Sequence, residues 1–208
     1  MKKSDSPYSA ALTGGGFLFK ETDILLPMLL SKDRKALLKD EALNNKVLKI
    51  NAEKSRKTNI REIERRFDSM PSSFWGDYMA MSEDDRKIAN LFVILKTYRI
   101  AFDFHVNVTM QKWKSVDKTL VRQDLIREFN DISAKDEFVD SWSENTKDKV
   151  AGSYLTFLRK VGMLDEKGNL SPINPTNPGY YLTIGESWFL EACLWAPYQI
   201  ENAKKAAL

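Results

Sequence analysis

The chain has 208 residues, of which 43% are hydrophobic and 29% are charged, a balance typical of a folded globular protein and not of a disordered or collagen-like chain. Lys and Arg number 32 against 29 Asp and Glu, so the formal net charge of +3 neither requires nor excludes a nucleic-acid partner. With one cysteine, Cys193, and one histidine, His105, the composition excludes a disulfide within the chain and a zinc cluster of Cys and His ligands.

Residues 1–81 predict a helix-turn-helix-like unit. After an irregular segment that ends in three glycines, apolar residues recur at helical spacing from Phe17, and a second short helix is expected over residues 33–42. A third helix is expected to begin at Thr58, a good N-cap, and to end before Pro71. Its buried stripe is expected to consist of Ile60, Ile63, Phe67 and Met70. Three helices, of which the third is basic on its outer face, follow the order of a helix-turn-helix unit.

Residues 82–116 predict a central connecting helical segment. Residues 72–81 are expected to be a linker, and Ser82 is expected to cap the helix that follows. Residues 88–95 are almost wholly apolar, which indicates a helix buried on all sides between the two ends of the chain. Residues 102–110 fit both the strict alternation of a strand and the spacing of a helix, and we favour a helix.

Three further helices are expected at the start of residues 117–208. The first is amphipathic and covers residues 120–129, and the second is short and is capped by Ser133 and Asp136. The third begins at a capping-box pair, Ser141 and Glu144, and is long, with its apolar side chains on one face. This order of helices is typical of a winged-helix unit when a β-hairpin follows it.

Such a hairpin, a small β-wing, is expected after the long helix. Gly162 ends that helix, and residues 163–170 predict a strand followed by a tight turn. Residues 180–183 are expected to return as the second strand of the wing, and a final aromatic helix is expected to begin at Thr183. The sequence therefore predicts a mostly α fold, in which two helix-turn-helix or winged-helix-like units are joined by a buried central helix and the C-terminal unit, residues 117–208, carries the wing.

Residues 32–66 form a basic segment. They contain twelve Lys or Arg and six Asp or Glu, a net charge of +6, so the rest of the chain carries about −3. Basic side chains that lead into the third helix or lie on its outer face are placed to meet phosphates, as is the N-terminus of the helix itself. These candidate DNA-binding residues are Lys54, Arg56, Lys57, Arg61 and Arg65. The alternative is a solvated helix face on which Glu62 pairs with Arg65 or Arg66.

The long helix near residue 150 offers a second candidate surface. Its outward positions carry Asn145, Lys149 and Arg159, which suit base edges or phosphates, and Gly152 would allow a close approach of backbone. Residues 131–144, immediately upstream, carry five acidic groups and one Lys, a net charge of −4 that would repel phosphate locally. Because winged-helix units also serve as protein–protein modules, contact with a protein is the alternative here.

No set of side chains indicates catalysis. His105 lies in an apolar, aromatic stretch without a catalytic partner nearby in sequence, and Cys193 is expected to be a buried, inert thiol. The glycines at residues 14–16 lack the Gly-Lys-Ser/Thr ending of a phosphate-binding loop. The acidic residues show no motif that would gather them around a metal. We therefore expect no metal, no cofactor and no enzymatic activity.

No segment predicts a membrane span or a secretion signal. The longest apolar run, residues 24–30, has seven residues and contains Pro27, whereas a spanning helix needs about 20 residues. The N-terminus lacks the apolar region of a signal peptide. These features predict a cytoplasmic protein without a membrane partner.

The order of several motifs resembles that of a known family. The motifs are Tyr8-Ser-Ala-Ala-Leu-Thr-Gly-Gly-Gly-Phe-Leu-Phe-Lys-Glu-Thr22, Ile63-Glu-Arg-Arg-Phe67, the helix from Thr146 to Leu158, and Gly162-Met-Leu164. Over nearly its whole length the chain is similar in these landmarks to BrxA, a small protein of the bacterial BREX (bacteriophage exclusion) defence systems. The resemblance implies a mostly helical cytoplasmic protein with two linked helix-turn-helix or winged-helix-like units, DNA binding and no enzymatic activity of its own. It also implies work beside a methyltransferase and ATPases in phage restriction and self-methylation.

These observations lead to one expectation and two alternatives. We expect a DNA-binding accessory protein that holds double-stranded DNA mainly through phosphate contacts, so that binding is weakly sequence-selective and strongly salt-dependent. The first alternative is a protein–protein adaptor that holds other BREX components together without touching nucleic acid. The second alternative is an RNA-binding protein.

Overall fold

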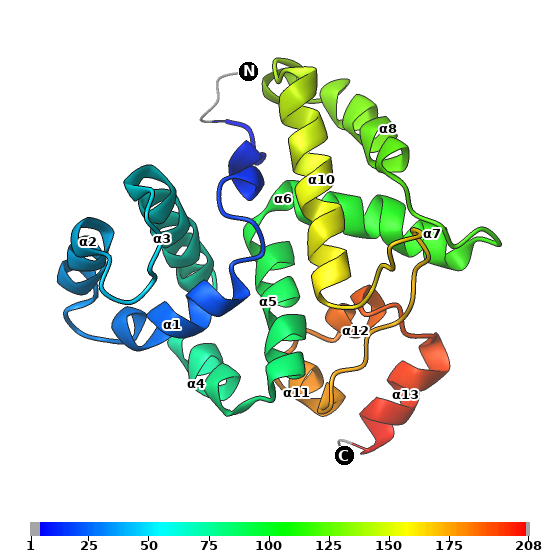
Figure 1. Cartoon of the computed structure of the whole chain (residues 1–208). Coiled ribbons are helices and arrows are strands. Elements are labelled where there is room, and N and C mark those ends of the chain that lie inside the picture. The colour runs from blue at the N-terminus through cyan, green and yellow to red at the C-terminus, as the bar shows by residue number, and fades with distance from the viewer. Residues whose placement is uncertain (1–4, 207–208) are drawn as a thin grey trace.

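The structure of the protein, a computed structural model, describes residues 5–206 (Figure 1). Within these residues every regular element is a helix and no strand forms, which confirms the predicted mostly α fold. Helix α5 (Glu83–Thr97) lies near the middle of the molecule, with helices on both sides of it (Figure 1). Every residue from Ile88 to Leu95 is buried, as the apolar run predicts. The predicted cap of this helix is also confirmed, because Ser82 Oγ accepts the N–H of Asp85 at 3.1 Å.

One 3₁₀ turn and four helices precede α5. They are η1 (Ala10–Thr13), α1 (Phe19–Leu29), α2 (Arg34–Asn44), α3 (Glu53–Asp68) and α4 (Ser72–Ala80). The predicted buried stripe of α3 is confirmed, but the predicted N-cap is wrong. Ala52 is the N-cap, and Thr58 lies inside the helix, where its Oγ donates to the carbonyl of Lys54 at 2.9 Å. An internal threonine satisfied in this way does not end a helix.

Residues 72–81 are largely helix α4 and not the predicted linker. Phe74, Trp75 and Tyr78 are spaced to lie on one face of a helix, and all three are buried. Trp75 Nε1 also donates to the carbonyl of Phe67 at 3.0 Å, which fixes α4 against the end of α3. Burial of three aromatic side chains outweighs the Ser and Gly content that suggested a linker.

The favoured helical interpretation of residues 102–110 is confirmed. Three short helical segments follow α5: α6 (Arg99–Asp103), the π-helical turn η2 (Phe104–Thr109) and α7 (Met110–Lys114). In the π-helical turn Phe104 and His105, and again Val108 and Thr109, are buried as adjacent pairs. The alternating apolar residues Phe102, Val106 and Met110, which also fit a strand, are only partly buried.

Six helices complete the chain. They are α8 (Arg122–Ser133), α9 (Glu137–Asp140), α10 (Glu144–Lys160), α11 (Pro178–Thr183), α12 (Trp188–Ala192) and α13 (Pro197–Ala206). Of the two predicted caps of α9, Asp136 is confirmed, because its Oδ1 accepts the N–H of Val139 at 3.0 Å, whereas Ser133 is the last residue of α8 and does not cap α9. The cap of α10 is Ser143, whose Oγ accepts the N–H of Thr146 at 3.2 Å, and not the predicted Ser141.

The predicted second strand of the β-wing is wrong. Residues 180–183 belong to α11, because Asn177 caps that helix through its Oδ1 and the N–H of Tyr180, at 3.2 Å. Pro178 occupies the first helical position, where its fixed φ favours a helix and its missing N–H costs nothing. The aromatic helix predicted to begin at Thr183 is divided between α12 and α13.

The other half of the predicted wing is reduced to two isolated antiparallel bridges. One joins Thr119 to Asn169 and the other joins Leu164 to Leu170. The tight turn predicted between them is present, since Asp165 Oδ1 accepts the N–H groups of Lys167 and Asn169, each at 2.8 Å. The turn is thus held by one carboxylate rather than by a sheet.

The buried apolar residues form one hydrophobic cluster that draws on both ends of the chain. Phe92 of α5 stands in its middle. The centroid of its ring lies 5.9 Å from that of Phe74, 5.5 Å from that of Tyr181 and 4.9 Å from that of Phe189. Helix α5 therefore joins α4 to α11 and α12 through aromatic contacts. Each of these contacts stabilises the fold by more than the area it buries would alone.

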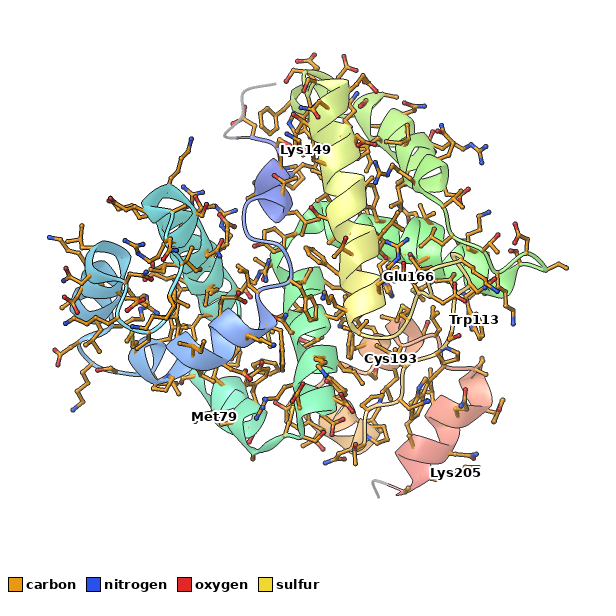
Figure 2. The ribbon with its side chains drawn as sticks, in the orientation of Figure 1. Met79, Trp113, Lys149, Glu166, Cys193 and Lys205 are labelled. Carbon is orange, nitrogen blue, oxygen red and sulfur yellow. The ribbon has the colours of Figure 1, made fainter. Side chains whose placement is uncertain are left out.

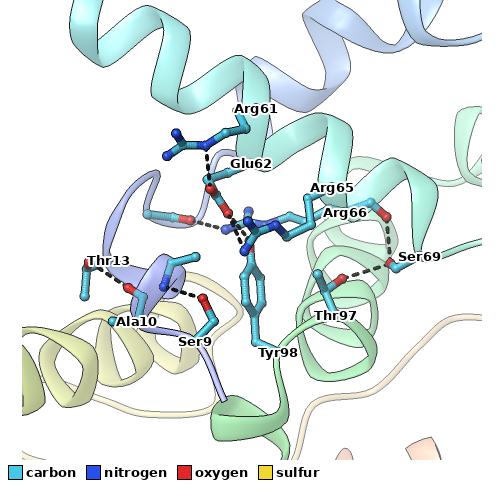
Figure 3. A network of polar contacts seen from close by, with 12 residues as sticks. Ser9, Ala10, Thr13, Arg61, Glu62, Arg65, Arg66, Ser69, Thr97 and Tyr98 are labelled. Atoms are coloured by element: carbon cyan, nitrogen blue, oxygen red, sulfur yellow. Dashed lines mark hydrogen bonds and ion pairs between the residues drawn. The ribbon is translucent and has the colours of Figure 1, made fainter. Parts of the chain in front are cut away.

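Arg66 of α3 is a buried cation, 1% exposed, that ties α3 to α5 and to the segment before α1 (Figure 3). Its guanidinium donates to the carbonyls of Gly16 at 2.7 Å and Phe17 at 2.9 Å, and to the hydroxyl of Tyr98 at 3.2 Å. That hydroxyl in turn donates to the buried carboxylate of Glu62 at 3.1 Å. The charge of Arg66 is thus balanced and all three donor nitrogens are used, as burial of a guanidinium requires.

The three glycines before α1 allow this contact. Gly16 has a φ of +68°, and a Cβ on Gly15 would lie 2.4 Å from Leu18 Cδ1. A Cβ on Gly14 would lie 3.2 Å from Thr58 Cγ2 of α3. The glycine run is therefore a close-packed turn against α3, which no other residue type would fit without a shift.

We predict that Arg66→Met destabilises the protein by about 3 kcal/mol or more, because the carbonyl of Gly16 and the hydroxyl of Tyr98 lose this donor and the buried Glu62 loses the cation that balances it. Urea unfolding followed by circular dichroism measures the change. The matched control is Arg65→Met, at the neighbouring exposed position, which should change the free energy of unfolding by less than about 1 kcal/mol. Equal effects of the two substitutions would contradict the role given to Arg66.

His105 and Cys193 are both fully buried, as expected for structural residues. His105 Nε2 lies 2.8 Å from the carbonyl of Ala192, so it carries the proton, and Nδ1 accepts from the hydroxyl of Tyr154 at 2.8 Å. Burial lowers the pKa of His105 to about 4, and burial raises the pKa of the Cys193 thiol. The imidazole is therefore neutral and the thiol is not activated.

We predict that His105 makes the protein less stable as the pH falls from 7 to 5. Its pKa is lower in the folded state than in the unfolded state, where it is about 6.5, so the unfolded state gains the proton first. Between pH 7 and pH 5 the wild type should lose about 2 kcal/mol more than His105→Gln, which does not titrate in this range. Urea unfolding of both proteins at the two pH values measures this, and an equal loss in both would contradict it.

Candidate nucleic-acid interface

Helices α2 and α3 are held at a fixed angle by a buried carboxylate in the connector between them. Glu41, which is 0% exposed, lies near the end of α2. It accepts the N–H groups of Lys46, Val47 and Leu48 at 2.8, 3.0 and 2.9 Å. These bonds satisfy the backbone of the connector without any strand or helix there, so α3 is positioned rigidly after α2.

Arg56 belongs to the same connection and not to the candidate surface. It is 4% exposed, and its guanidinium donates to the carbonyls of Ala42, Leu43 and Ile50 at 2.9, 3.2 and 2.6 Å. Two of these carbonyls lie in the last turn of α2, where a cation also interacts favourably with the helix dipole. The interpretation of Arg56 as a phosphate contact is therefore wrong, since its donors are already used inside the protein.

The other predicted residues of α3 remain on its surface. Lys54 is exposed, and the exposed fractions of the Lys57, Arg61 and Arg65 side chains are 52%, 66% and 42%. Lys57 forms an ion pair with Glu53 one turn earlier. Exposed pairs of this kind contribute little to stability, so both partners can exchange for other ions.

Arg61 and Arg65 share one acidic neighbour, the buried Glu62 (Figure 3). Arg61 Nε lies 3.2 Å from one carboxylate oxygen of Glu62, and Arg65 Nη1 lies 3.6 Å from the other. Each arginine uses only part of its planar donor group in this contact, so the remaining N–H groups point to solvent and can meet a second anion.

The structure adds two lysines that the sequence analysis did not single out. Lys35 and Lys39 of α2 face Lys57 and Arg61 of α3 across a shallow groove of about 330 Å³. Glu64 also lines this groove, but it is paired with Arg34, whose Nε lies 3.5 Å away. The signal in the sequence is the spacing of the two lysines, four residues apart on one helix face; which helix they face depends on tertiary packing.

The net charge of the basic segment lies on its exposed or partly exposed side chains. Within residues 32–66 the buried charged residues are two arginines and two glutamates: Arg56, Arg66, Glu41 and Glu62. Their charges cancel, so the whole net charge of +6 is carried by exposed or partly exposed side chains. We call the face formed by Lys35, Lys39, Lys54, Lys57, Arg61 and Arg65 the α2–α3 basic surface.

On α10 the predicted residues differ in how accessible they are. Asn145 and Lys149 are exposed, and Lys149 lies in the N-terminal half of the helix (Figure 2). Arg159 is half-buried: its Nε is covered, meets no hydrogen-bond partner among residues 5–206, and lies 3.9 Å from an oxygen of Glu166. Asn145 and Lys149 are therefore the better candidates for contact with a ligand.

Gly152 does not leave an open approach to the backbone of α10. The space where its Cβ would lie is within 3.3 Å of the guanidinium of Arg122, at the start of α8. Arg122 Nη1 donates to both oxygens of Asp148, each at 2.8 Å, and the Arg122 side chain is 53% exposed. Arg122 is therefore a surface cation beside Lys149 that the sequence analysis did not include.

Acidic residues stand beside the N-terminus of α10. Asp136 is buried and serves as the cap of α9. The other acidic residues of this stretch are exposed: Asp131, Glu137, Asp140 and Glu144. The α10 face is thus less favourable for phosphate than the α2–α3 basic surface.

Two other kinds of site were sought in residues 5–206. No group of three or more His, Cys, Asp or Glu in this part of the chain is placed to hold a metal ion. None of the helices in the same range combines the length and apolar character that crossing a membrane requires.

Two of three comparisons with known proteins find similar proteins. The model of the family described as BrxA matches residues 6–177. Among solved structures, an uncharacterized protein from Magnetospirillum magneticum is similar, with a TM-score of 0.74 at 18% sequence identity, over 90% of this chain and 98% of that one. At this identity the likeness concerns the fold. No curated protein matches.

We predict that Arg56→Ala destabilises the protein by about 3 kcal/mol, because it removes a buried guanidinium that donates to three carbonyls and leaves a cavity in its place. The neighbouring substitution Lys57→Ala removes an exposed cation and should change the free energy of unfolding by less than about 0.5 kcal/mol. Urea unfolding of the two variants separates the roles. A Lys57 variant as unstable as the Arg56 variant would contradict the assignment.

Proposed function

The chain belongs to the BrxA family, and we propose that it is a non-enzymatic, DNA-binding accessory protein of a BREX phage-defence system. The family implies a role in BREX phage defence and is not a known enzyme family. We further propose that the protein acts in the cytoplasm, with double-stranded DNA and other BREX components, a methyltransferase and ATPases, as its partners.

One observation carries the proposal of DNA binding: the α2–α3 basic surface holds six exposed cations, and the charges buried beneath it cancel. Cations on a rigid helix pair can meet several phosphates at once and release their counterions. The order α2, connector, α3 is that of a helix-turn-helix unit, which supports the assignment of α3 as the helix that approaches the duplex.

A second contact is proposed through α10. Helix α8, helix α10 and the two bridges around the turn at residues 165–169 follow the order of a winged helix. Asn145, Lys149 and Arg122 lie on the exposed side of this unit. Because acidic residues lie close by, we expect this face to orient the duplex rather than to supply most of the affinity.

We predict that Arg61→Gln with Arg65→Gln weakens duplex binding at least about tenfold and lowers the slope of log K against log salt by about 2, because two phosphate contacts are lost. Glutamine keeps a donor for Glu62, so the fold should be retained. Lys35→Gln with Lys39→Gln should act in the same direction. Fluorescence anisotropy with a labelled duplex over a salt series measures both.

The matched control is Lys204→Gln with Lys205→Gln on α13, which removes the same charge far from α10 and its Lys149 (Figure 2). This control should leave the salt slope unchanged. Unchanged affinity in the α3 double variant would overturn the α2–α3 site. If the wild type fails to bind duplex at low salt yet captures other BREX proteins, the adaptor function replaces the proposal; a preference for single strands or hairpins would instead favour RNA.

A further inference from the structure

Loop 114–118, between α7 and α8, projects from the body of the protein at the edge of the molecule (Figure 1). Val116 has a relative exposure of 104%, the highest among the exposed large apolar residues of the described part of the chain. Its isopropyl group therefore touches nothing within the protein. An apolar residue presented in this way is a candidate contact with a partner rather than part of the core.

We propose that this loop enters the minor groove of the bound duplex and that Val116 inserts as a wedge between base pairs, which bends the DNA. This inference rests on the proposed DNA binding. It specifies in addition that the loop enters the minor groove and that the bound DNA is bent. Proteins that bind the minor groove use apolar side chains between base steps, flanked by basic residues that hold the phosphates. The loop combines both features.

The tip of the loop is held in one conformation by its own side chains. Ser115 Oγ lies 2.8 Å from the carbonyl of Lys112 and 2.6 Å from that of Asp117, and its single hydroxyl proton is shared between these two acceptors. Asp117 Oδ1 accepts the N–H of Thr119 at 3.0 Å and also the hydroxyl of that residue. A loop that is ordered before binding loses little conformational entropy when its tip is inserted. The free energy gained from the apolar contact is therefore not cancelled by the entropy cost of ordering the loop.

Cations stand on both sides of the valine. Lys114 is exposed, and Lys118 Nζ lies 3.8 Å above the centroid of the Trp113 ring. The aromatic face orients that ammonium group without neutralising its charge. Lys112 is paired with Asp117 and Asp124, so the two lysines left for phosphates are those that flank Val116.

The loop is attached to the unit that contains α10. The N–H of Leu120 donates to the carbonyl of Gly168 at 2.8 Å, and the N–H of Leu170 donates to the carbonyl of Lys118 at 3.0 Å. A Cβ on Gly168 would lie 3.1 Å from the carbonyl oxygen of Leu120, so a glycine, here at φ +88°, fits this contact. Loop, turn and α10 thus form one body, in which the loop can reach a groove beside the one that α10 faces.

A protein partner is the other reading of an exposed apolar residue, and single exposed apolar residues are common. Two features favour DNA. The loop offers one apolar side chain, far less area than a stable protein interface needs, whereas a wedge between base pairs needs only one. Its unpaired charges are positive, which complements phosphate.

The test measures DNA bending by fluorescence resonance energy transfer between dyes at the ends of a duplex of about 30 base pairs, with anisotropy for affinity. The wild type should bend the duplex. Val116→Ser should abolish the bend and weaken binding by up to about tenfold without changing the salt slope, because no cation is removed.

Lys114→Gln with Lys118→Gln should lower the salt slope by about 2. Val121→Ala, at a nearby valine that is 50% exposed, is the matched control and should leave bend and affinity unchanged.

The outcomes separate this inference from the proposed function. If the wild type binds the duplex but does not bend it, or if Val116→Ser bends it equally, the wedge is wrong and DNA binding stands. If the Val116 variant binds and bends DNA normally but loses other BREX proteins in a pull-down, the loop contacts protein and the inference is overturned. If the wild type does not bind duplex at low salt, the proposed function fails, and this inference with it.

Discussion

The buried guanidinium of Arg66 is the contact on which the arrangement of the protein depends. It joins α3 to α5 through Tyr98 and to the segment before α1 through the carbonyls of Gly16 and Phe17. The carbonyl of Phe17 also accepts from Asn90 of α5 at 2.8 Å, and the Phe17 ring lies 5.9 Å from the ring of Phe157 on α10. A single polar network therefore sets how the basic helix α3 stands relative to both the central helix and α10. Because an unpaired buried charge is costly, this network forms completely or not at all.

Charge in the basic segment has two separate uses. Inside the protein, Glu41 and Arg56 fix the connector between α2 and α3, and Glu62 and Arg66 fix α3 against α5. Outside, exposed or partly exposed side chains carry the net charge of +6, and six of these cations form the α2–α3 basic surface. The buried pairs make the helix rigid, so the exposed cations keep a constant spacing, and constant spacing is what multiple phosphate contacts require.

The segments predicted to form a β-wing, residues 163–170 and 180–183, form no strand in the protein. Two isolated bridges, an aspartate-held turn and the close approach of Gly168 to Leu120 replace the predicted hairpin. The segment after Leu170 does not pair as a strand: its three prolines have no N–H to donate, the N–H groups of Ile173 and Thr176 donate to Cys193 and Asp85, and Asn177 with Pro178 begins a helix instead. The consequence is that two short connections, the turn and loop 114–118, lie side by side where a winged helix would have a sheet edge.

The sequence by itself determined the features that depend on neighbours along the chain. Apolar periodicity was enough for α5, α8 and α10, the local caps at Ser82 and Asp136 were correct, and the counts of His and Cys excluded whole classes of metal and disulfide chemistry. The misplaced start of α3 hid the role of Arg56. Counted back from Ile60 and Ile63 by four and seven residues, Arg56 lies on the buried stripe, but only if the helix already includes it.

Tertiary structure alone decided the rest. Lys35 and Lys39 become part of a site only because α2 packs beside α3, and Arg122 lies over Gly152 only because α8 packs on α10. Glu62, Arg65 and Arg66 are close neighbours on one helix. Which of them are buried and which are exposed depends on the positions of Tyr98 and of the carbonyls of Gly16 and Phe17. The local sequence pattern indicates which faces of a helix are apolar. It does not indicate which distant donor or acceptor will contact a charged side chain. Those contacts distinguish the structural cations of this protein from the cations that remain free to bind a partner.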